Sequence, residues 1–200
     1  MGQFQRRANN FMNRLSTTSY SNSATKVGGD LDLGTLMKDF QAIGSEIFLD
    51  KLLVSLMNIL LENARAQIGY LMLETDKKLL VEASGEVSNE HISVLQSICL
   101  KDSPYLARSI VNYVWRTQET VLLNDATVEG KFSNDCHIKK HQPKSILCIP
   151  LINQGQLSGI VYFENNLTTE AFTPERLQIL QLLSGEAAIA IAHARLYHNL

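Results

Sequence analysis

Two pairs of apolar segments with strand periodicity, each joined by a short polar break, place the strongest constraint on the fold of this chain. The first pair, IGYLMLE (68–74) and LLVEAS (79–84), is separated by TDKK, and the second, KSILCIPLI (144–152) and QLSGIVYFE (156–164), by NQG. Breaks of this length connect neighbouring antiparallel strands. We therefore predict two β-hairpins in one antiparallel sheet. Because Pro150 lacks a backbone N–H, its strand must lie at an edge or pair irregularly there.

Two further strands and two helices are predicted before the second hairpin. Alternation in SVLQSICL (93–100) indicates a third strand, and TVLLND (120–125) a fourth. A helix between them is expected to begin after Pro104, with its apolar face at Leu106, Ile110 and Val114. A helix with a broad apolar face, running from Ile47 to Ala64, is expected ahead of the first hairpin. Residues 126–143 form a polar excursion without a long periodic run.

The chain is predicted to end in a long helix. Thr173 is a suitable N-cap, Pro174 suits the first turn, and apolar spacing continues to Leu200. Two stripes recur on it: one at Leu177, Leu180, Ser184, Ala187, Ile191, Ala194 and His198, the other at Leu182, Ile189 and Leu196. We expect one stripe to cover the sheet and the other to meet a second chain, which predicts a homodimer through the first and last helices.

The N-terminal residues differ in composition from the rest. Residues 1–29 carry four basic residues and no acidic one, and residues 16–29 are rich in Ser, Thr and Gly, so we predict a flexible basic arm. Helical apolar spacing within residues 1–15 indicates a short amphipathic helix that could dock on a protein partner. Residues 30–46 predict a lead-in helix, and residues 47–200 the folded domain.

Composition excludes several classes of protein. No apolar run approaches the roughly 20 residues that span a bilayer, and the start MGQFQRR lacks a secretory signal. Cys99, Cys136 and Cys148 are odd in number and have no paired spacing, which favours reduced thiols in a cytoplasmic protein. Only the arm is basic, and it lacks a folded element for groove recognition, so nucleic-acid binding is not expected.

Three segments carry a resemblance to a known family: LDKLLVSLMNILLENARAQIGYLMLE (49–74), SIVNYVWRTQETVLLNDAT (109–127) and the run from QPKSILCIPL to AHARLY (142–197). They resemble GAF domains of large cyanobacterial sensor kinases, in which a Ser/Thr kinase and an ATPase-like region precede the GAF domain and a histidine kinase follows. The resemblance implies an α+β fold with a central antiparallel sheet of about six strands, flanked by N- and C-terminal helices. It also implies a non-catalytic sensory module that relays ligand binding through its terminal helices. No kinase segment is expected in this chain, which would be a fragment or act through partners in trans.

The candidate ligand pocket combines the polar excursion with residues of the hairpins. DCHIKKH (135–141) places His137 and His141 at i and i+4, so one helical turn would put both imidazoles on one face. Three candidate ligands are too few for a closed structural zinc site, Pro143 disfavours helix at Gln142, and a solvated loop is the alternative. No metal site is predicted. The candidate pocket residues are Tyr70, Asp125, Phe132, Cys136, His137, His141, Ile149 and Tyr162.

Several alternatives stay open. Cys136 followed by His137 matches the pair with which bilin-binding GAF domains hold a tetrapyrrole, so bilin or haem binding is a second hypothesis for that loop. Enzymatic activity is not expected, because the Gly- and Cys-rich sequence of the GAF-like methionine sulfoxide reductases has no counterpart at the three cysteines. Cyclic-nucleotide binding is not expected either, because Asn166 replaces the Lys of the motif for that activity. A scaffold protein recruited by the basic arm is a third hypothesis.

Overall fold

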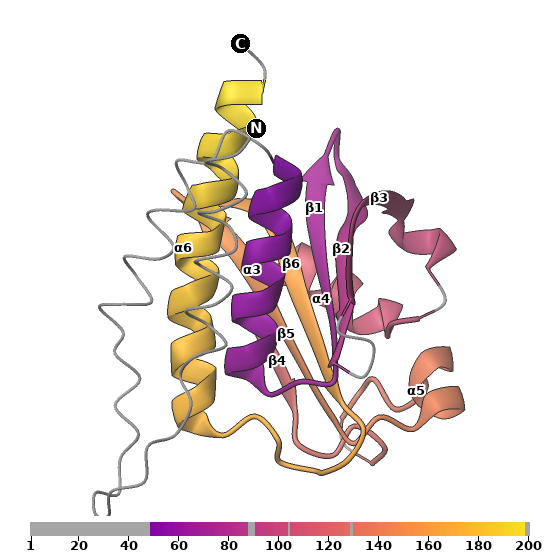
Figure 1. Ribbon diagram of the computed structural model, residues 1–200. Helices are drawn as coiled ribbons and strands as arrows, with labels where there is room; N and C mark the ends of the chain where they lie inside the picture. The colour runs from indigo at the N-terminus through magenta and orange to yellow at the C-terminus, as the bar shows by residue number, and fades with distance from the viewer. Residues whose placement is uncertain (1–48, 88–90, 104, 129, 199–200) are drawn as a thin grey trace, which may run out of the picture. The chain divides into compact units, whose positions relative to one another are not determined.

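The six predicted strands are present and form a single sheet. The structure, a computed structural model, describes residues 49–87, 91–103, 105–128 and 130–198. In these residues the strands lie in the order β3-β2-β1-β6-β5-β4, and all neighbouring pairs are antiparallel. Their bounds are β1 Ile68–Thr75, β2 Lys78–Glu86, β3 His91–Cys99, β4 Val121–Leu123, β5 Ser145–Asn153 and β6 Gln156–Asn165. The predicted α+β fold with a central antiparallel sheet is confirmed (Figure 1).

Both predicted hairpins are confirmed, and both close through two residues in the left-handed region. In the β1–β2 hairpin these are Asp76 and Lys77, with φ of 50° and 58°. In the β5–β6 hairpin they are Gln154 and Gly155, with φ of 50° and 77°. Two-residue turns with positive φ match the right-handed twist of the strands they join. Pairing of β1 with β6 then unites the hairpins at the centre of the sheet.

Pro150 lies in β5 beyond the end of the β4 ladder. The described pairing of β4 with β5 runs from Leu123 opposite Ile146 to Val121 opposite Cys148. At Pro150, β5 is therefore paired on its β6 side only, opposite Ile160. A residue without an N–H is tolerated at such a position because no second ladder needs its donor.

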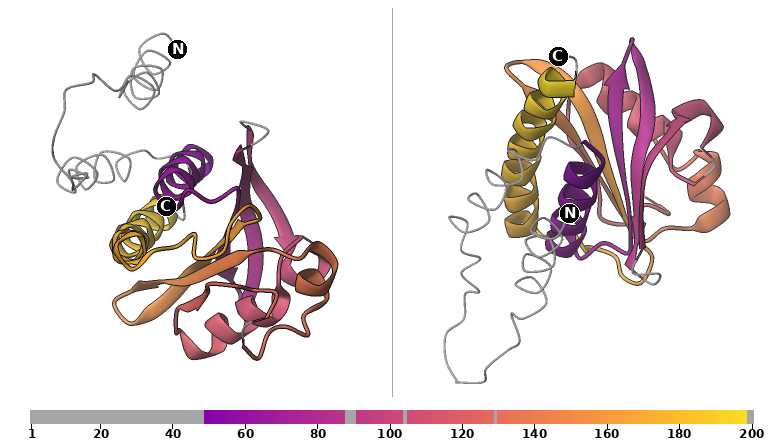
Figure 2. Two further views of the ribbon diagram at one scale, coloured as in Figure 1. Left: turned by 90° about the horizontal axis from the view of Figure 1, so that it is seen from below. Right: turned by 45° about the horizontal axis from the view of Figure 1, so that its top comes forward.

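Helices α3 (Leu49–Ala64) and α6 (Pro174–His198) lie side by side on one face of the sheet (Figures 1 and 2). The apolar face of α3 is fully buried, at Leu52, Leu53, Leu56, Met57 and Leu60. Close approach of α3 to the sheet depends on two glycines: a Cβ on Gly69 or Gly85 would lie 2.7 or 2.6 Å from a Leu61 methyl carbon.

The two stripes predicted on the last helix differ in burial. The first is buried at Leu180, Ser184, Ala187, Ile191 and Ala194, each 2% exposed or less. The second is exposed, at 47% for Leu182, 40% for Ile189 and 66% for Leu196. The segment 174–196 is long and apolar enough to cross a membrane by length and composition alone. Of the residues in its most apolar window, 44% are buried within the fold.

The opposite face of the sheet carries α4 (Arg108–Thr117), α5 (Cys136–His141) and the 3-10 helix η2 (Leu100–Asp102) (Figure 2). A second apolar core lies there. It joins the buried face of α4 at Ile110, Val111 and Val114 to sheet residues that include Met72, Ile146, Cys148, Ile160 and Tyr162. The domain therefore has three layers within the described residues: α3 with α6, the sheet, and α4 with α5.

A β-bulge at Glu82 changes which side chains of β2 face each layer. Leu71 pairs with Ala83 and Met72 with Val81, so Glu82 is an extra residue in β2. Before the bulge, Val81 packs in the α4 core. After it, Ser84 and Glu86 take the α4 and α5 side, because one additional residue reverses the alternation.

Several predictions fall outside the described residues. These are the basic arm over 1–29, its short amphipathic helix, the lead-in helix over 30–46, and the last two residues of the predicted final helix.

Candidate functional site

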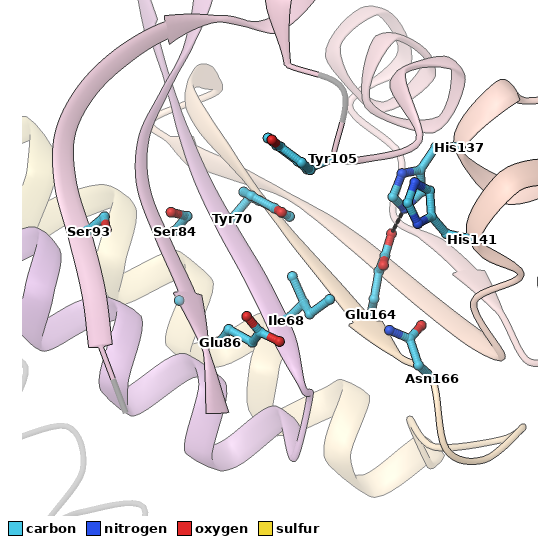
Figure 3. Close-up of a pocket in the computed structure, with 11 residues that line it drawn as sticks. Ile68, Tyr70, Ser84, Glu86, Ser93, Tyr105, His137, His141, Glu164 and Asn166 are labelled. Atoms are coloured by element: carbon cyan, nitrogen blue, oxygen red, sulfur yellow. Dashed lines mark hydrogen bonds and ion pairs between the residues drawn. The ribbon is translucent and has the colours of Figure 1, made fainter. Parts of the chain in front are cut away.

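A cavity of about 500 Å³ lies on the sheet face that carries α4 and α5. Its walls come from β1, β2, β3, β6, α5 and the segment before α4, and Figure 3 shows the side chains converging on one hollow. The lining residues are Ile68, Tyr70, Ser84, Gly85, Glu86, Ser93, Tyr105, His137, His141, Glu164 and Asn166. This volume lies within the range of small-molecule sites in proteins.

Strand alternation places the sheet residues of the lining. On β1, Ile68 and Tyr70 share the face of Met72, which belongs to the α4 core. On β6, Glu164 shares the face of Tyr162. On β2, Ser84 and Glu86 point to the cavity only because of the Glu82 bulge. The floor of the cavity is therefore set by two strands with regular alternation and one with a bulge.

The Glu164 carboxylate is the buried polar centre of the site. Glu164 is 1% exposed, and its Oε1 atom accepts hydrogen bonds from His137 Nε2 at 2.6 Å and from the Tyr162 hydroxyl at 2.5 Å. The Tyr162 hydroxyl in turn accepts a hydrogen bond from the Ala107 backbone N–H at 3.2 Å. A charged group that is buried needs such partners. The chain of contacts links α5, β6 and the residue that precedes α4.

The two histidines are positioned by a short, well-capped helix. The Asp135 carboxylate caps α5, accepting from the His137 N–H at 2.8 Å, and its second oxygen accepts from the Ser109 N–H of α4 at 2.9 Å. The predicted turn at i and i+4 is confirmed: the rings of His137 and His141 stack with centroids 4.7 Å apart. The helix ends at His141, as expected from Pro143, although Gln142 adopts the left-handed region, with φ of 51°, rather than the extended conformation usual before proline.

The solvated-loop hypothesis for residues 135–141 is wrong, because the segment forms a helix that buries His137. His137 is only 8% exposed, because α5 presses it against β6 and Glu164 holds its ring. His141 and Cys136 are exposed. The helix therefore presents one buried imidazole and one at the cavity surface.

Burial and negative charge both act on the tyrosines of the site. Burial raises the pKa of Tyr70 well above its ordinary value, and the carboxylates of Glu164 and Glu86 raise it further. Burial also raises the pKa of Tyr162, again with a contribution from Glu164. Both phenols are therefore neutral hydrogen-bonding groups at physiological pH.

Three of the predicted pocket residues, Tyr70, His137 and His141, line the cavity. Tyr162 lies beneath it, fully buried, with its hydroxyl on Glu164.

The other four predicted pocket residues lie elsewhere. Ile149 belongs to β5, out of phase with Ile146 and Cys148 of the α4 core, so alternation turns it to the α3 and α6 side. Phe132 packs in the α4 core, edge to face with Tyr113. Asp125 closes a turn by accepting from Thr127 Oγ1 at 2.6 Å. Cys136, at the first position of α5, is exposed and does not line the cavity.

Glu164 is the most important residue that the sequence prediction missed. A signal for it was present, because Glu164 follows Tyr162 by two positions on a strand and so shares its face. Ser84 and Glu86 carried no such signal, since unbroken alternation from Val81 would turn them away from the cavity. Ser93, Tyr105 and Asn166 were also missed.

These contacts bear on whether the site could hold a metal ion or a cofactor. Among residues 49–87, 91–103, 105–128 and 130–198, no group of three or more His, Cys, Asp or Glu side chains is arranged to hold a metal ion. His137 Nε2 is already engaged by Glu164, and Cys136 is not among the lining residues. The cavity is better suited to a ligand held by hydrogen bonds and ring contacts than to one held by a thioether or an axial imidazole.

Comparison with protein families and solved structures agrees with the fold. A family model described as GAF domain matches residues 46–192. The GAF domain of an Acinetobacter phosphoenolpyruvate-protein phosphotransferase superimposes with a TM-score of 0.61 at 20% identity, covering 84% of this chain and 97% of that one. At this identity the likeness concerns the fold alone.

Two curated relatives are histidine kinases. The chain is 45% identical over 89 residues to hybrid signal transduction histidine kinase G of Dictyostelium discoideum, covering 44% of this chain. It is 27% identical over 172 residues to the peroxide stress-activated histidine kinase mak3 of Schizosaccharomyces pombe, covering 84% of this chain. The alignments span only 3% and 7% of the length of those two proteins.

Proposed function

We propose that this chain, which belongs to the GAF domain family, is the sensory module of a signal-transduction protein and binds a small molecule in the cavity beside α5. The observation that carries the proposal is the cavity itself, about 500 Å³ with Glu164, His137 and Tyr70 in its walls. An apolar core would fill this space with side chains, whereas a receptor keeps a hollow with a few fixed polar groups.

The route from the cavity to the last helix is short. Asn166 lines the cavity and directly follows β6. The adjoining Asn165 side chain accepts hydrogen bonds from the backbone N–H groups of Leu167 and Thr168, which orders the start of the connection to α6. A ligand that prefers one arrangement of this connection would shift the position of α6. We propose α6 as the output element.

We also propose that the output is read in a homodimer. The exposed stripe of α6 at Leu182, Ile189 and Leu196 has seven-residue spacing, as in the seam of a coiled coil. The homodimer interface would include this stripe.

The proposed output domain is a histidine kinase supplied by the same protein or by a partner. Similarity to two histidine kinases supports this proposal, although the chain spans a small share of their length. We further propose that the module works in the domain arrangement of the cyanobacterial sensor kinases, in which a Ser/Thr kinase and an ATPase-like region precede the GAF domain. The module itself is proposed to be non-catalytic and cytoplasmic.

The two alternative hypotheses have less support. A covalent bilin would require the Cys136 thiol at the cavity, and that side chain is exposed outside the lining. The scaffold hypothesis depends on a basic arm that lies outside the described residues.

A metabolite panel tests the proposal on the full 200-residue chain. Compounds that raise the melting temperature would be mapped by NMR, with Ser84→Phe as a cavity-filling variant and Lys78→Phe as a control at the exposed start of the same strand. The proposal predicts a ligand whose binding is lost in Ser84→Phe and retained in Lys78→Phe. It fails if every stabilising compound binds both variants equally, or if no compound binds.

A further inference from the structure

We infer that the cavity selects an organic cation, such as a protonated amine or an amidinium, over an anion of the same shape. The inference rests on the proposed function, because it names the chemical class of ligand for the same cavity. Two features of the lining carry it: its charges and its rings.

The charges of the lining are negative. Glu86 and Glu164 belong to the lining, and the eleven lining residues include no Lys and no Arg. Glu164 is buried, so its interaction with a ligand is weakly screened, whereas Glu86 is exposed at the rim and contributes less. An anionic ligand would meet repulsion from these carboxylates, which only the two histidines of the lining could offset. Figure 3 shows Glu86 below Tyr70 and Glu164 beside the two histidines, with Ile68 between the two glutamates.

Aromatic rings also line the cavity. Tyr70 lies in the lining from β1, and Tyr105, 64% exposed, lies at the edge of the cavity (Figure 3). The face of a tyrosine ring attracts a cation within about 6 Å of its centroid. A site that combines ring faces with carboxylates suits a positively charged head group on a small organic body.

The Tyr70 phenol is affected by the same two carboxylates. The carboxylates of Glu164 and Glu86 add to the burial that raises its pKa, so a second negative charge at this position is unfavourable. The histidines act in the opposite direction when protonated. His137 and His141 both face the cavity, and acid would weaken the preference for a cation.

Three isosteric probes test the inference: benzamidine as the cation, benzamide as the neutral form and benzoate as the anion. Binding to the full chain would be measured by NMR titration at pH 8, where an imidazole is ordinarily neutral, in low and high salt. We expect benzamidine to bind at least about tenfold more tightly than benzamide, and benzoate not to saturate. We expect Glu86→Gln to weaken benzamidine binding and Glu62→Gln, on the exposed face of α3, to leave it unchanged.

The outcomes separate this inference from the proposed function. Benzoate or benzamide binding in the cavity as tightly as benzamidine would overturn the cation preference and leave a ligand-binding cavity in place. Benzamidine binding that is equal in Glu86→Gln and the native chain would also overturn it. Failure of all three probes overturns the inference, and the proposed function then depends on the metabolite panel.

Discussion

His137 Nε2 lies 2.6 Å from Glu164 Oε1, and both side chains are buried, at 7% and 1% exposure. The contact spans 27 positions of sequence and fixes α5 on the edge of the cavity. Because Tyr162 donates to the same oxygen, the carboxylate stays satisfied only as part of a set of three side chains.

Removing the imidazole should therefore be costly. His137→Ala removes the imidazole partner of the buried Glu164 carboxylate, and we expect a loss of about 3 kcal/mol in the free energy of unfolding. His141→Ala, one turn later and exposed, is the matched control and should cost less than about 0.5 kcal/mol. Urea unfolding followed by circular dichroism measures both. Equal effects of the two variants would show that the buried pair contributes little.

Asp135 should make stability depend on pH in the acid range. Partial burial acts to raise its pKa, but hydrogen bonds from Ser109, His137 and Ile138 outweigh it and hold the pKa below the ordinary value. A lowered folded pKa means that the stabilisation is complete above about pH 4 and is lost as pH falls through the folded value. We expect Asp135→Ala to cost about 1 to 2 kcal/mol at pH 7, as for other helix caps.

The control for this pH dependence is Asp135→Asn. Asn retains an oxygen for the His137 N–H but has no carboxylate to titrate. The difference in unfolding free energy between this variant and the native chain should therefore shrink as pH falls below about 4. Unfolding free energies measured from pH 7 to pH 2.5 would check this. A difference that stays constant over that range would contradict the role assigned to the ionised carboxylate.

Much of the fold was predictable because the spacing of apolar residues and the turn residues along the chain define it. The two hairpins, the cap at Thr173 and both stripes of α6 follow from spacing and turn chemistry, and the Thr173 hydroxyl accepts from the Arg176 N–H as a cap should. The site was less predictable. An extra residue at Glu82 reverses the side chains that follow it, and no local sequence signal marks such a bulge.

Long-range pairing was the second obstacle. His137 was recognised as a candidate for its position in DCHIKKH, but its partner Glu164 is reached only through the packing of α5 on β6. Asp125 and Phe132, which precede that segment, were also predicted to line the pocket, and they instead stabilise a turn and the α4 core. A one-dimensional pattern shows which face a strand residue takes, but not which helix will cover it.

Ser184 is expected to be a position where a smaller, apolar side chain stabilises the fold. Its hydroxyl is buried and has no hydrogen-bond partner within the described structure. Burial of an unsatisfied hydroxyl is unfavourable, so we expect Ser184→Ala to raise the free energy of unfolding by about 1 kcal/mol more than a control substitution. Ser55→Ala, at a half-buried position of α3, is that control, because it reports the gain in helix propensity alone. Identical gains in both variants would mean that Ser184 finds a partner in solution.

Two glycines should respond in opposite directions to alanine. A Cβ on Gly159 in β6 would lie 2.2 Å from the Met72 carbonyl oxygen, and backbone cannot move aside as a side chain can. A Cβ on Gly185 in α6 would meet nothing within 4 Å. We expect Gly159→Ala to lower the free energy of unfolding by about 2 kcal/mol or more, which is the order of magnitude for overpacking. We expect Gly185→Ala to stabilise it by about 0.5 to 1 kcal/mol. Thermal unfolding of both variants measures the contrast, which a destabilised Gly185→Ala would contradict.

The exposed stripe of α6 provides the test of self-association. Ile189 is the central member, 40% exposed between Leu182 and Leu196, and a charge there would have to be desolvated on pairing. We expect Ile189→Glu to raise the dimer dissociation constant at least tenfold, measured by analytical ultracentrifugation of the full chain. Gln181→Glu, also exposed on α6, adds the same charge beside the stripe and is the matched control. Since Ile189 faces away from the buried stripe, the melting temperature extrapolated to low protein concentration should change little. A native chain that is monomeric at about 100 μM would overturn the proposed homodimer, and a dimer that tolerates Glu at position 189 would place its interface away from the α6 stripe.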